Sequence, residues 1–442
     1  MYLIEHEGTI RAHGSPPERR DRTACRAAAA MAVLALLAVG GCTDVLDSLL
    51  EVEAPSQVEA SSAEVPANAK LLVDGAVADF DCALGHYINT GGLLGEELTD
   101  PQQTAAQWDL DRRTILVEGG YYATSTCNDR MGAYTPLSVA RWEADNILTK
   151  LEAWTDAEVK NRAGLMATAA AYSGYAHTLM GEGFCTAAFD AGPELSRAQV
   201  FERAEDRFTR ALASAAQAGR TDLANLARLG RARARLNAGR LAEAASDARL
   251  IPEGFVFNAN YSAATTRSEN TVWVQYSRSQ NTTVESFYQG LTVEGVKDVR
   301  VSLTDLKKKG TNNKTPLFTP DKYTSAVSPI PIARWAEAQL IIAEAEGGAS
   351  AVAIIDKLRA KRNLPAYSGP TDAAAVKALI IEERRRELFL ESHHLGDLIR
   401  YNQPLRPAAG TPWFNGGSYG SVRCMPLPDV ERLNNPTLKG GE

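Results

Sequence analysis

Histidine and cysteine are both scarce in this sequence, which has six of each among 442 residues. It contains no Cys-x-x-Cys pair, no phosphate-binding P-loop and no G-x-G-x-x-G fingerprint, the short patterns that mark many metal and nucleotide sites. We therefore expect neither a metal nor a cofactor. A long basic run is also missing and the net charge is −7, which argues against a nucleic-acid-binding protein because phosphate contacts need an excess of Lys and Arg.

The apolar run at residues 27–39 is too short to cross a bilayer, since its thirteen residues fall well below the roughly 20 of a spanning helix. Just before the run lie Arg19, Arg20, Arg22 and Arg26, and two glycines follow it, in the order typical of a cleaved secretory signal. Val39–Cys42 also resembles a bacterial lipobox, in which the cysteine is acylated. We expect residues 1–41 to be a lipoprotein signal peptide and Cys42 to be lipidated. The alternative is an ordinary signal peptide cut nearby.

Four cysteines remain between the predicted lipidation site and the C-terminus: Cys82, Cys127, Cys185 and Cys424. A secreted protein meets an oxidising compartment, and four cysteines allow three pairings. We favour Cys82 with Cys127 and Cys185 with Cys424. Free buried thiols are the alternative, because an unpaired cysteine packs as a small hydrophobe.

Apolar residues recur at helical spacing through most of the chain, which predicts a mostly α-helical protein. Small residues such as Gly230, Gly239 and Ala244 favour tetratricopeptide-type helix pairs, since they let antiparallel helices approach closely. In contrast, TVWVQYS and VRVSLTDL alternate like short strands. The predicted organisation is a polar tether at 42–69 and a single domain at 70–442, with helix pairs at 135–252 and 329–402, loops and short strands at 253–328, and an irregular segment at 403–442.

The stretch EERRRELFLESHHLGDLIRYN, residues 382–402, concentrates charges and a histidine pair. Glu391 and His394 match half of a di-iron site, but the sequence supplies no second Glu-x-x-His pair. We therefore interpret the stretch as structural, with Glu382 pairing with Arg386 and one of the two histidines pairing with Asp397.

Two further patterns bear on catalysis. Residues 416–420 satisfy G-x-S-x-G, but no histidine follows them, so the triad order of an α/β-hydrolase is excluded. Glu96, Glu97 and Asp100 could supply the carboxylate pair of a glycosidase. The chain has 54 acidic residues, however, so neighbouring acids carry little information. We expect no catalytic residue and no enzyme.

Several blocks of the chain resemble, in order and spacing, the RagB/SusD family of outer-membrane lipoproteins. They are CTDVLD at Cys42, IPIARWAEAQLIIAEAE, IIDKLRAKRNLP, IEERRRELFLESHHLGDLIRYN and the terminal MPLPDVERLNNPTL. The resemblance implies a SusD-like α-solenoid scaffold of tetratricopeptide-like helix pairs. It also implies a lipid-anchored protein, exposed at the cell surface, that captures an oligosaccharide, or in some members a peptide, and delivers it to a SusC-like TonB-dependent transporter barrel.

Two other functions stay open: a helix-pair scaffold that binds only protein, and, more weakly, a secreted glycoside hydrolase. If the ligand is a sugar, flat aromatic faces should hold its apolar ring side while polar groups hold its hydroxyls. We interpret Trp142, Trp154 and Trp335 as core residues, and Arg334, Glu337, Glu344, Arg385 and Asp397 as structural. The candidate ligand contacts, for which a core role is the alternative, are Trp108, Tyr121, Tyr122, Trp273, Tyr276, Tyr288, Trp413 and Phe414.

Overall fold

The computed structural model describes residues 63–118, 120–129 and 131–438. From Glu64 onward the described residues form one compact unit. The predicted signal peptide, Cys42 and most of the predicted tether lie outside the described residues. The end of that tether is ordered, since Pro66–Asn68 form a 3-10 turn that leads into the first long helix. None of the described helices combines the length and the apolar character that crossing a bilayer requires.

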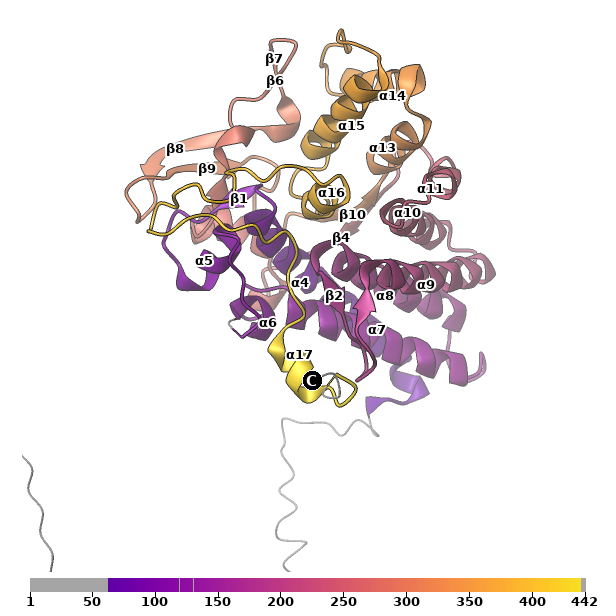
Figure 1. The fold of residues 1–442 in the computed structure, drawn as a ribbon. Helices are drawn as coiled ribbons and strands as arrows, with labels where there is room; N and C mark the ends of the chain where they lie inside the picture. Colours follow the sequence, from indigo (N-terminus) through magenta and orange to yellow (C-terminus); the bar gives the residue numbers. More distant parts are fainter. Residues whose placement is uncertain (1–62, 119, 130, 439–442) are drawn as a thin grey trace, which may run out of the picture. The chain divides into compact units, whose positions relative to one another are not determined.

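The predicted mostly helical fold is confirmed (Figure 1). Neighbouring helices pack against one another in sequence order from α7 to α11 and on through α13 to α15, while α4 packs against α7 and α8. The long helices are α4 (Ala69–Leu94), α7 (Tyr134–Ala153), α8 (Arg162–Gly183), α9 (Arg197–Gln217), α10 (Thr221–Asn237), α11 (Leu241–Ala248), α13 (Trp335–Glu346), α14 (Gly348–Ala360) and α15 (Ala373–Glu387). The shorter ones are α5 (Ala105–Asp111), α6 (Tyr121–Thr124), α12 (Thr271–Trp273), α16 (His394–Arg400) and α17 (Asp429–Asn434).

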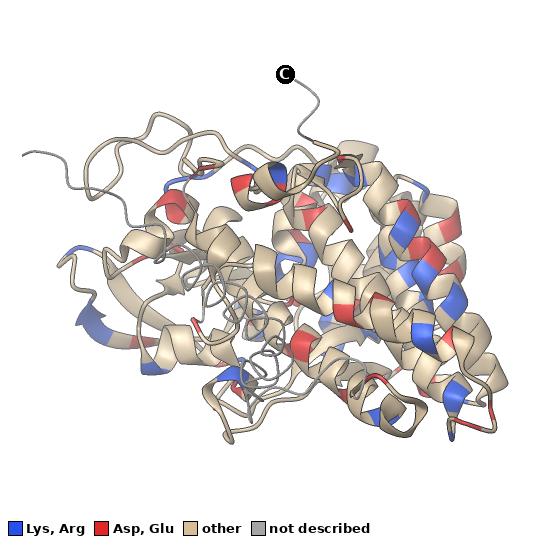
Figure 2. Ribbon diagram, turned by 90° about the horizontal axis from the view of Figure 1, so that it is seen from below, with Lys and Arg blue, Asp and Glu red and all other residues tan. Residues whose placement is uncertain are grey.

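Small residues set the helix spacing, as the sequence predicts. The ring of Phe208 in α9 is buried between Gly174 of α8 and Gly230 of α10. A Cβ atom at Gly174 would lie 2.7 Å from that ring, so only glycine allows the approach. Helix α9 begins at a capping box in which Ser196 and Gln199 bond each other's backbone N–H. Its polar positions face outward, and the outer helices in Figure 2 carry interspersed acidic and basic residues.

The strands of the described chain form two-stranded antiparallel sheets. Most of them lie in the predicted loop and strand region, and β4 with β10 joins that region to the second helical block. The pairs are β1 (Leu98–Thr99) with β5 (Thr283–Val284), β2 (Thr186–Ala187) with β3 (Leu195–Ser196), β4 (Val256–Ala259) with β10 (Ile330–Arg334), β6 (Thr292–Val293) with β7 (Val296–Lys297), and β8 (Leu303–Lys309) with β9 (Pro316–Pro320).

Two sequence interpretations are wrong. TVWVQYS is helical: α12 and the π-turn η3 (Val274–Arg278) cover it, and Asn270 caps the N-terminus by accepting from the Trp273 N–H at 3.0 Å. Nearly every residue of this segment is buried, so its alternating apolar residues do not separate a core face from a solvent face. Trp142 is 47% exposed rather than in the core, because it lies one position beyond the buried face of α7.

The two disulfides are Cys82–Cys127 and Cys185–Cys424, the pairs that the sequence analysis favoured. The first ties α4 to the loop after α6. The second holds the irregular C-terminal chain against the end of α8, where Cys185 N–H donates to Met425 O at 2.9 Å. The last described part of the chain is thereby attached to the helical scaffold.

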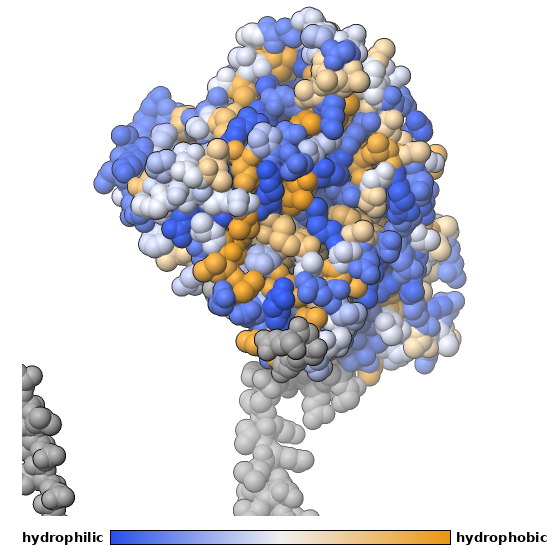
Figure 3. All heavy atoms as spheres, in the orientation of Figure 1, coloured by the Kyte–Doolittle hydropathy of each residue, from blue (hydrophilic) through white to orange (hydrophobic). Residues whose placement is uncertain are grey.

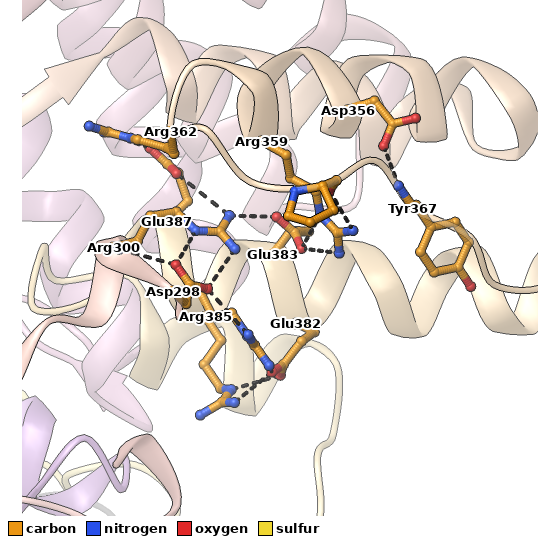
Figure 4. Close-up of polar contacts among 12 residues, drawn as sticks. Asp298, Arg300, Asp356, Arg359, Arg362, Tyr367, Glu382, Glu383, Arg385 and Glu387 are labelled. Carbon is orange, nitrogen blue, oxygen red and sulfur yellow. Dashed lines mark hydrogen bonds and ion pairs between the residues drawn. The ribbon is translucent and has the colours of Figure 1, made fainter. Parts of the chain in front are cut away.

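The charges of residues 382–402 form buried ion pairs (Figure 4). Glu383 of α15 accepts from Arg300 at 2.5 Å and from Arg359 of α14 at 2.7 Å, and all three side chains are buried. The predicted pair of Glu382 with Arg386 is present at 2.6 Å.

The predicted pairing of Asp397 with a histidine is wrong, because its carboxylate accepts from Arg384 at 2.7 Å and from Arg400 at 2.8 Å. An arginine presents several N–H donors in a rigid fork, so it satisfies a buried carboxylate better than an imidazole does.

We predict that Glu383→Ala destabilises the protein by about 3–5 kcal/mol, because it leaves Arg300 and Arg359 buried with too few acceptors. Urea denaturation of the domain measures the change. The matched control is Glu152→Ala, which breaks an exposed pair with Arg210 and should leave the midpoint almost unchanged. Equal shifts in the two variants would contradict a stabilising role for the buried pairs.

Candidate functional site

The Glu391-x-x-His394 half-site has no carboxylate oxygen left for a metal ion. Glu391 is buried and accepts from Arg334 at 2.7 Å, while Lys322 contacts its other oxygen at 2.5 Å. His394 packs against the ring of Tyr288, and burial lowers its pKa to about 4. Two cations already neutralise the carboxylate, so the structure favours the structural interpretation of this motif.

A second group of metal-type ligands is formed by Cys82, His86 and Cys127, whose ligand atoms lie within 4.8 Å of one another. Both cysteines are joined in a disulfide, however, and offer no thiolate. His86 Nδ1 contacts the carbonyl oxygens of Met131 and Gly132 at 3.2 and 3.1 Å. The arrangement is therefore that of a disulfide beside a buried histidine.

A polar cluster lies in the core between α8, α10 and α13. Arg233 donates to both oxygens of Glu182 at 2.8 and 2.6 Å and approaches His393 Nε2 at 3.3 Å. Burial, together with Arg233 and other nearby cations, holds the pKa of His393 well below its usual value. Glu337 is 1% exposed, and neither of its oxygens has a hydrogen-bond partner among the described residues. Burial raises the pKa of Glu337 to about 7.

The three carboxylates considered for a glycosidase are buried and hold backbone groups. Glu96 accepts from the Arg406 N–H, Glu97 from the Leu390 N–H at 2.9 Å, and Asp100 from the backbone of residues 102 and 104 at 2.8 and 2.9 Å. Burial raises the pKa of each to about 7. Glu96 and Glu97 anchor distant loops and Asp100 holds the turn that follows it, so all three carboxylates have structural partners.

Three of the candidate aromatic residues come together on the loop side of the domain. The ring of Trp108 in α5 lies 6.1 Å from that of Trp413, which lies 4.3 Å from Phe414. The Arg112 guanidinium lies 5.6 Å from the Trp413 ring. Trp108, Arg112 and Phe414 are partly exposed, whereas Trp413 is buried and donates from Nε1 to Asp111 at 2.7 Å. We call Trp108, Arg112, Trp413 and Phe414 the aromatic platform.

A glycine-rich turn of the C-terminal chain builds the platform. Trp413 N–H donates to Gly417 O at 3.0 Å, and Gly416 and Gly417 adopt φ values of 94° and 73°, which favour glycine. Gly420 N–H then donates to Arg112 O at 2.8 Å, which holds the turn against the end of α5. This explains the G-x-S-x-G match without a nucleophile. In Figure 1 the yellow C-terminal chain passes α5, and this side of Figure 3 is mostly blue and pale, with few hydrophobic patches.

The other candidates lie elsewhere. Tyr122, Tyr276 and Tyr288 are at most 3% exposed, and the first two donate their hydroxyls to the backbone oxygens of residues 426 and 323. We correct these three to core anchors, because a buried ring has no face for a ligand. Tyr121 is 58% exposed on α6, and Trp273 is partly buried beside Arg278, but neither joins the platform.

Arg112 was missed as a candidate by the sequence analysis. It lies four residues after Trp108, a spacing that puts two side chains on one helix face, and this signal could have found it. Trp413 was predicted to contact the ligand, but it is buried, so it supports the platform and offers no face of its own.

Comparisons with known proteins show which family and which solved structures this chain resembles. Residues 234–420 match the sequence model of the SusD family. Over these residues the chain is similar in sequence to the SusD family. No curated protein matches it. Among solved structures, a putative sugar binding protein from Bacteroides vulgatus is 16% identical with a TM-score of 0.63, over 84% of this chain and 97% of that one.

Two further SusD-like structures agree with this fold. A carbohydrate binding protein from Bacteroides vulgatus is 15% identical with a TM-score of 0.63, over 85% of this chain and 97% of that one. A laminarin binding protein is 15% identical with a TM-score of 0.55, over 83% and 98%. At these identities the likeness establishes the fold and leaves the ligand of this chain to be determined.

We predict that Glu337→Gln stabilises the protein at pH 8 by about 3 kcal/mol and has little effect near pH 4.5. The folded-state pKa of about 7 lies above the unfolded value of 4.5, so the stability that the wild-type protein has at low pH is lost as the pH rises between these values. Glutamine has no ionisable group, so the side chain of the variant stays neutral across this pH range. Denaturant midpoints across this pH range measure the effect.

Glu152→Gln, at an exposed carboxylate, is the control and should show no such pH dependence. A Glu337→Gln variant less stable than wild type at pH 8 would mean that the ionised carboxylate stabilises Arg233 and Arg384, and would contradict the prediction.

Proposed function

We propose that this protein is a cell-surface, nutrient-binding lipoprotein that captures an oligosaccharide on the aromatic platform and passes it to a SusC-like TonB-dependent transporter. The match of residues 234–420 to the SusD family model and the sugar- or carbohydrate-binding descriptions of similar structures support the class. The observation that carries the proposal is the platform, because it combines partly exposed aromatic rings with a rigid support.

The platform has the chemistry of a sugar site. Trp108 and Phe414 can cover the apolar face of a pyranose ring, and burial of that surface favours binding. Arg112 and Asp109 lie beside them and can bond the hydroxyls at the ring edge. The Lys314 ammonium donates to the Phe414 carbonyl at 3.1 Å, which adds a further polar group at the rim.

The rigid support lowers the entropy cost of binding. Trp413 is fixed by Asp111, and nearby in the chain the Arg113 side chain donates to Glu96 at 3.2 Å and lies 4.8 Å from the Tyr419 ring. A preformed site orders few side chains when the ligand arrives. Because the nearby acids are committed to backbone and arginine donors, the proposed role is binding without catalysis.

Delivery requires an anchor near the transporter. We propose that Cys42 carries the lipid, and that the segment between it and α4 connects the membrane to the domain. Several acyl chains hold a lipoprotein stably, whereas one chain binds reversibly. The transporter is assigned from the family and stays a proposal for this chain.

We predict that Trp108→Ala and Phe414→Ala each weaken glycan binding at least about tenfold, which corresponds to about 1.4 kcal/mol, because each removes a stacking face. Calorimetric titration of the domain with a panel of soluble glycans, laminarin included, measures the affinity. Trp142→Ala is the matched control, since it removes an exposed indole from α7 and should bind like wild type.

An equal loss in Trp142→Ala would contradict the site assignment. Binding of soluble peptides but of no glycan would overturn the oligosaccharide assignment. Failure to bind either would favour a scaffold that recognises only protein.

We predict that Cys42→Ser abolishes fatty-acid labelling and moves the protein from the outer-membrane fraction to the soluble fraction. Cys25→Ser, in the predicted signal peptide, is the control and should change neither result. Metabolic labelling with an alkyne fatty acid, followed by fractionation, tests both variants. Labelling that survives in Cys42→Ser would contradict the assigned acylation site.

A further inference from the structure

The hairpin of β8 and β9 carries a group of exposed lysines beside the aromatic platform. Lys307, Lys308 and Lys309 end β8, and Lys314 lies in the turn that leads to β9. All four residues are exposed, and the blue strand end in Figure 2 marks the first three. We call these four residues the lysine rim.

The lysine rim adjoins the platform. The Lys314 ammonium donates to the carbonyl oxygen of Phe414 at 3.1 Å. Lys309 pairs across the hairpin with Pro316, two positions beyond Lys314, and paired strands lie only about 5 Å apart. In Figure 1 the yellow C-terminal chain runs between this hairpin and α5. The lysines and the aromatic rings are therefore close enough to contact one extended ligand.

The fold holds the hairpin end in place. The Asn312 N–H donates to the Pro101 carbonyl at 3.3 Å, and the Thr311 hydroxyl donates to the Gln102 carbonyl at 2.7 Å. Gly310 allows this approach, because a Cβ atom there would collide with the Pro101 carbonyl. These contacts seat the turn on the loop that leads into α5, so the backbone of the rim needs no ordering when a ligand arrives.

Most of the positive charge in the rim has no internal partner. The Lys307 ammonium pairs with Asp305 at 2.7 Å, but the other three lysines take part in none of the ion pairs of the described residues. On the platform itself, Arg112 pairs with Asp109 at 3.3 Å. Like charges held close together repel one another, so an anion that binds among them relieves this repulsion.

The acids near the platform do not cancel this charge. Asp109 is shared with Arg112, and Asp111 is buried and accepts from the Trp413 indole. The segments 306–320 and 403–424, which supply the rim and the C-terminal part of the platform, contain no acidic residue. A protein with a net charge of −7 thus presents a basic edge at its proposed binding site.

The combination of rings and lysines selects among anionic partners. A phosphate-bearing lipid surface would engage the lysines but has no use for a stacking face. A nucleic acid tracks a basic groove along its backbone, and this acidic protein carries only a short group of lysines. A glycan with carboxylate or sulfate groups uses both features, since its rings stack while its charges form charge-assisted hydrogen bonds.

Resting on the proposed function, we propose that the ligand of the aromatic platform is an anionic glycan. Its pyranose rings lie on Trp108 and Phe414, and its carboxylate or sulfate groups bind the lysine rim. The rim also speeds capture, because attraction between opposite charges raises the rate of encounter.

Calorimetric titration of the intact protein tests the proposal with two matched pairs of probes. Oligogalacturonate is compared with its methyl ester, and sulfated laminarin with laminarin, since each pair keeps the backbone and differs in charge. We expect at least one charged probe to bind at least tenfold more tightly than its neutral partner at about 0.01 M salt. The preference should fall below about threefold at about 1 M salt, where charges are screened. The pair that shows it identifies carboxylate or sulfate as the group bound.

The double variant Lys308→Gln with Lys309→Gln should lower the ratio of charged to neutral affinity at least fivefold, because it removes two unpaired charges from the rim. The matched control is Lys160→Gln with Lys377→Gln, which removes the same charge from exposed lysines between α7 and α8 and on α15. The control should keep the ratio within about twofold. Trp108→Ala should weaken binding of the charged probe, since one ligand contacts both features.

Equal affinity for the charged and neutral probes would overturn this inference and leave the oligosaccharide assignment standing. Binding of none of the four glycans would overturn both. A charged probe that binds Trp108→Ala as tightly as wild type would show an anion site apart from the platform and contradict the shared ligand. Tighter binding to phosphatidylglycerol vesicles or to an oligonucleotide than to either charged glycan would assign the rim to phosphate and also overturn the inference.

Discussion

The arrangement of this protein depends on arginine–carboxylate pairs buried around α15. Glu383 is shared by Arg300, from the loop and strand region, and Arg359, from α14. One turn later Glu387 accepts from Arg334, at the end of β10, at 2.9 Å. Removing any partner leaves an unpaired charge in the low-dielectric interior of the protein. The stability of each contact therefore depends on the others. They fix the irregular middle of the chain against the helices, which packing of loops alone would do only weakly.

The rigid core supports the surface on which we propose that the ligand binds. The platform is built on loops, which carry function most often when a stiff scaffold supports them. Buried Asp111 fixes the Trp413 indole, and the neighbouring Arg113 donates to buried Glu96, so the core holds the support of the platform. The platform would therefore meet its ligand with little reorganisation.

The sequence predicted the scaffold well and the sites only in part. Helix periodicity and the small residue Gly230 were sufficient for the helix pairs, since a ring such as Phe208 can pack only where a neighbour lacks a side chain. The helix at TVWVQYS was missed because burial on all sides removes the periodic signal. Trp108 and Trp413 were both named, but no local pattern relates residues so far apart in the chain.

The Cys185–Cys424 link spans 239 positions and closes most of the domain into a covalent ring. A protease that cuts once anywhere inside this ring, in a surface loop of the middle region for example, releases no fragment. The nicked product keeps its mass and migrates as two pieces only after a reducing agent opens the sulfur bridge. At the cell surface, where we propose that the protein acts, such a ring would keep the domain assembled after a single cut.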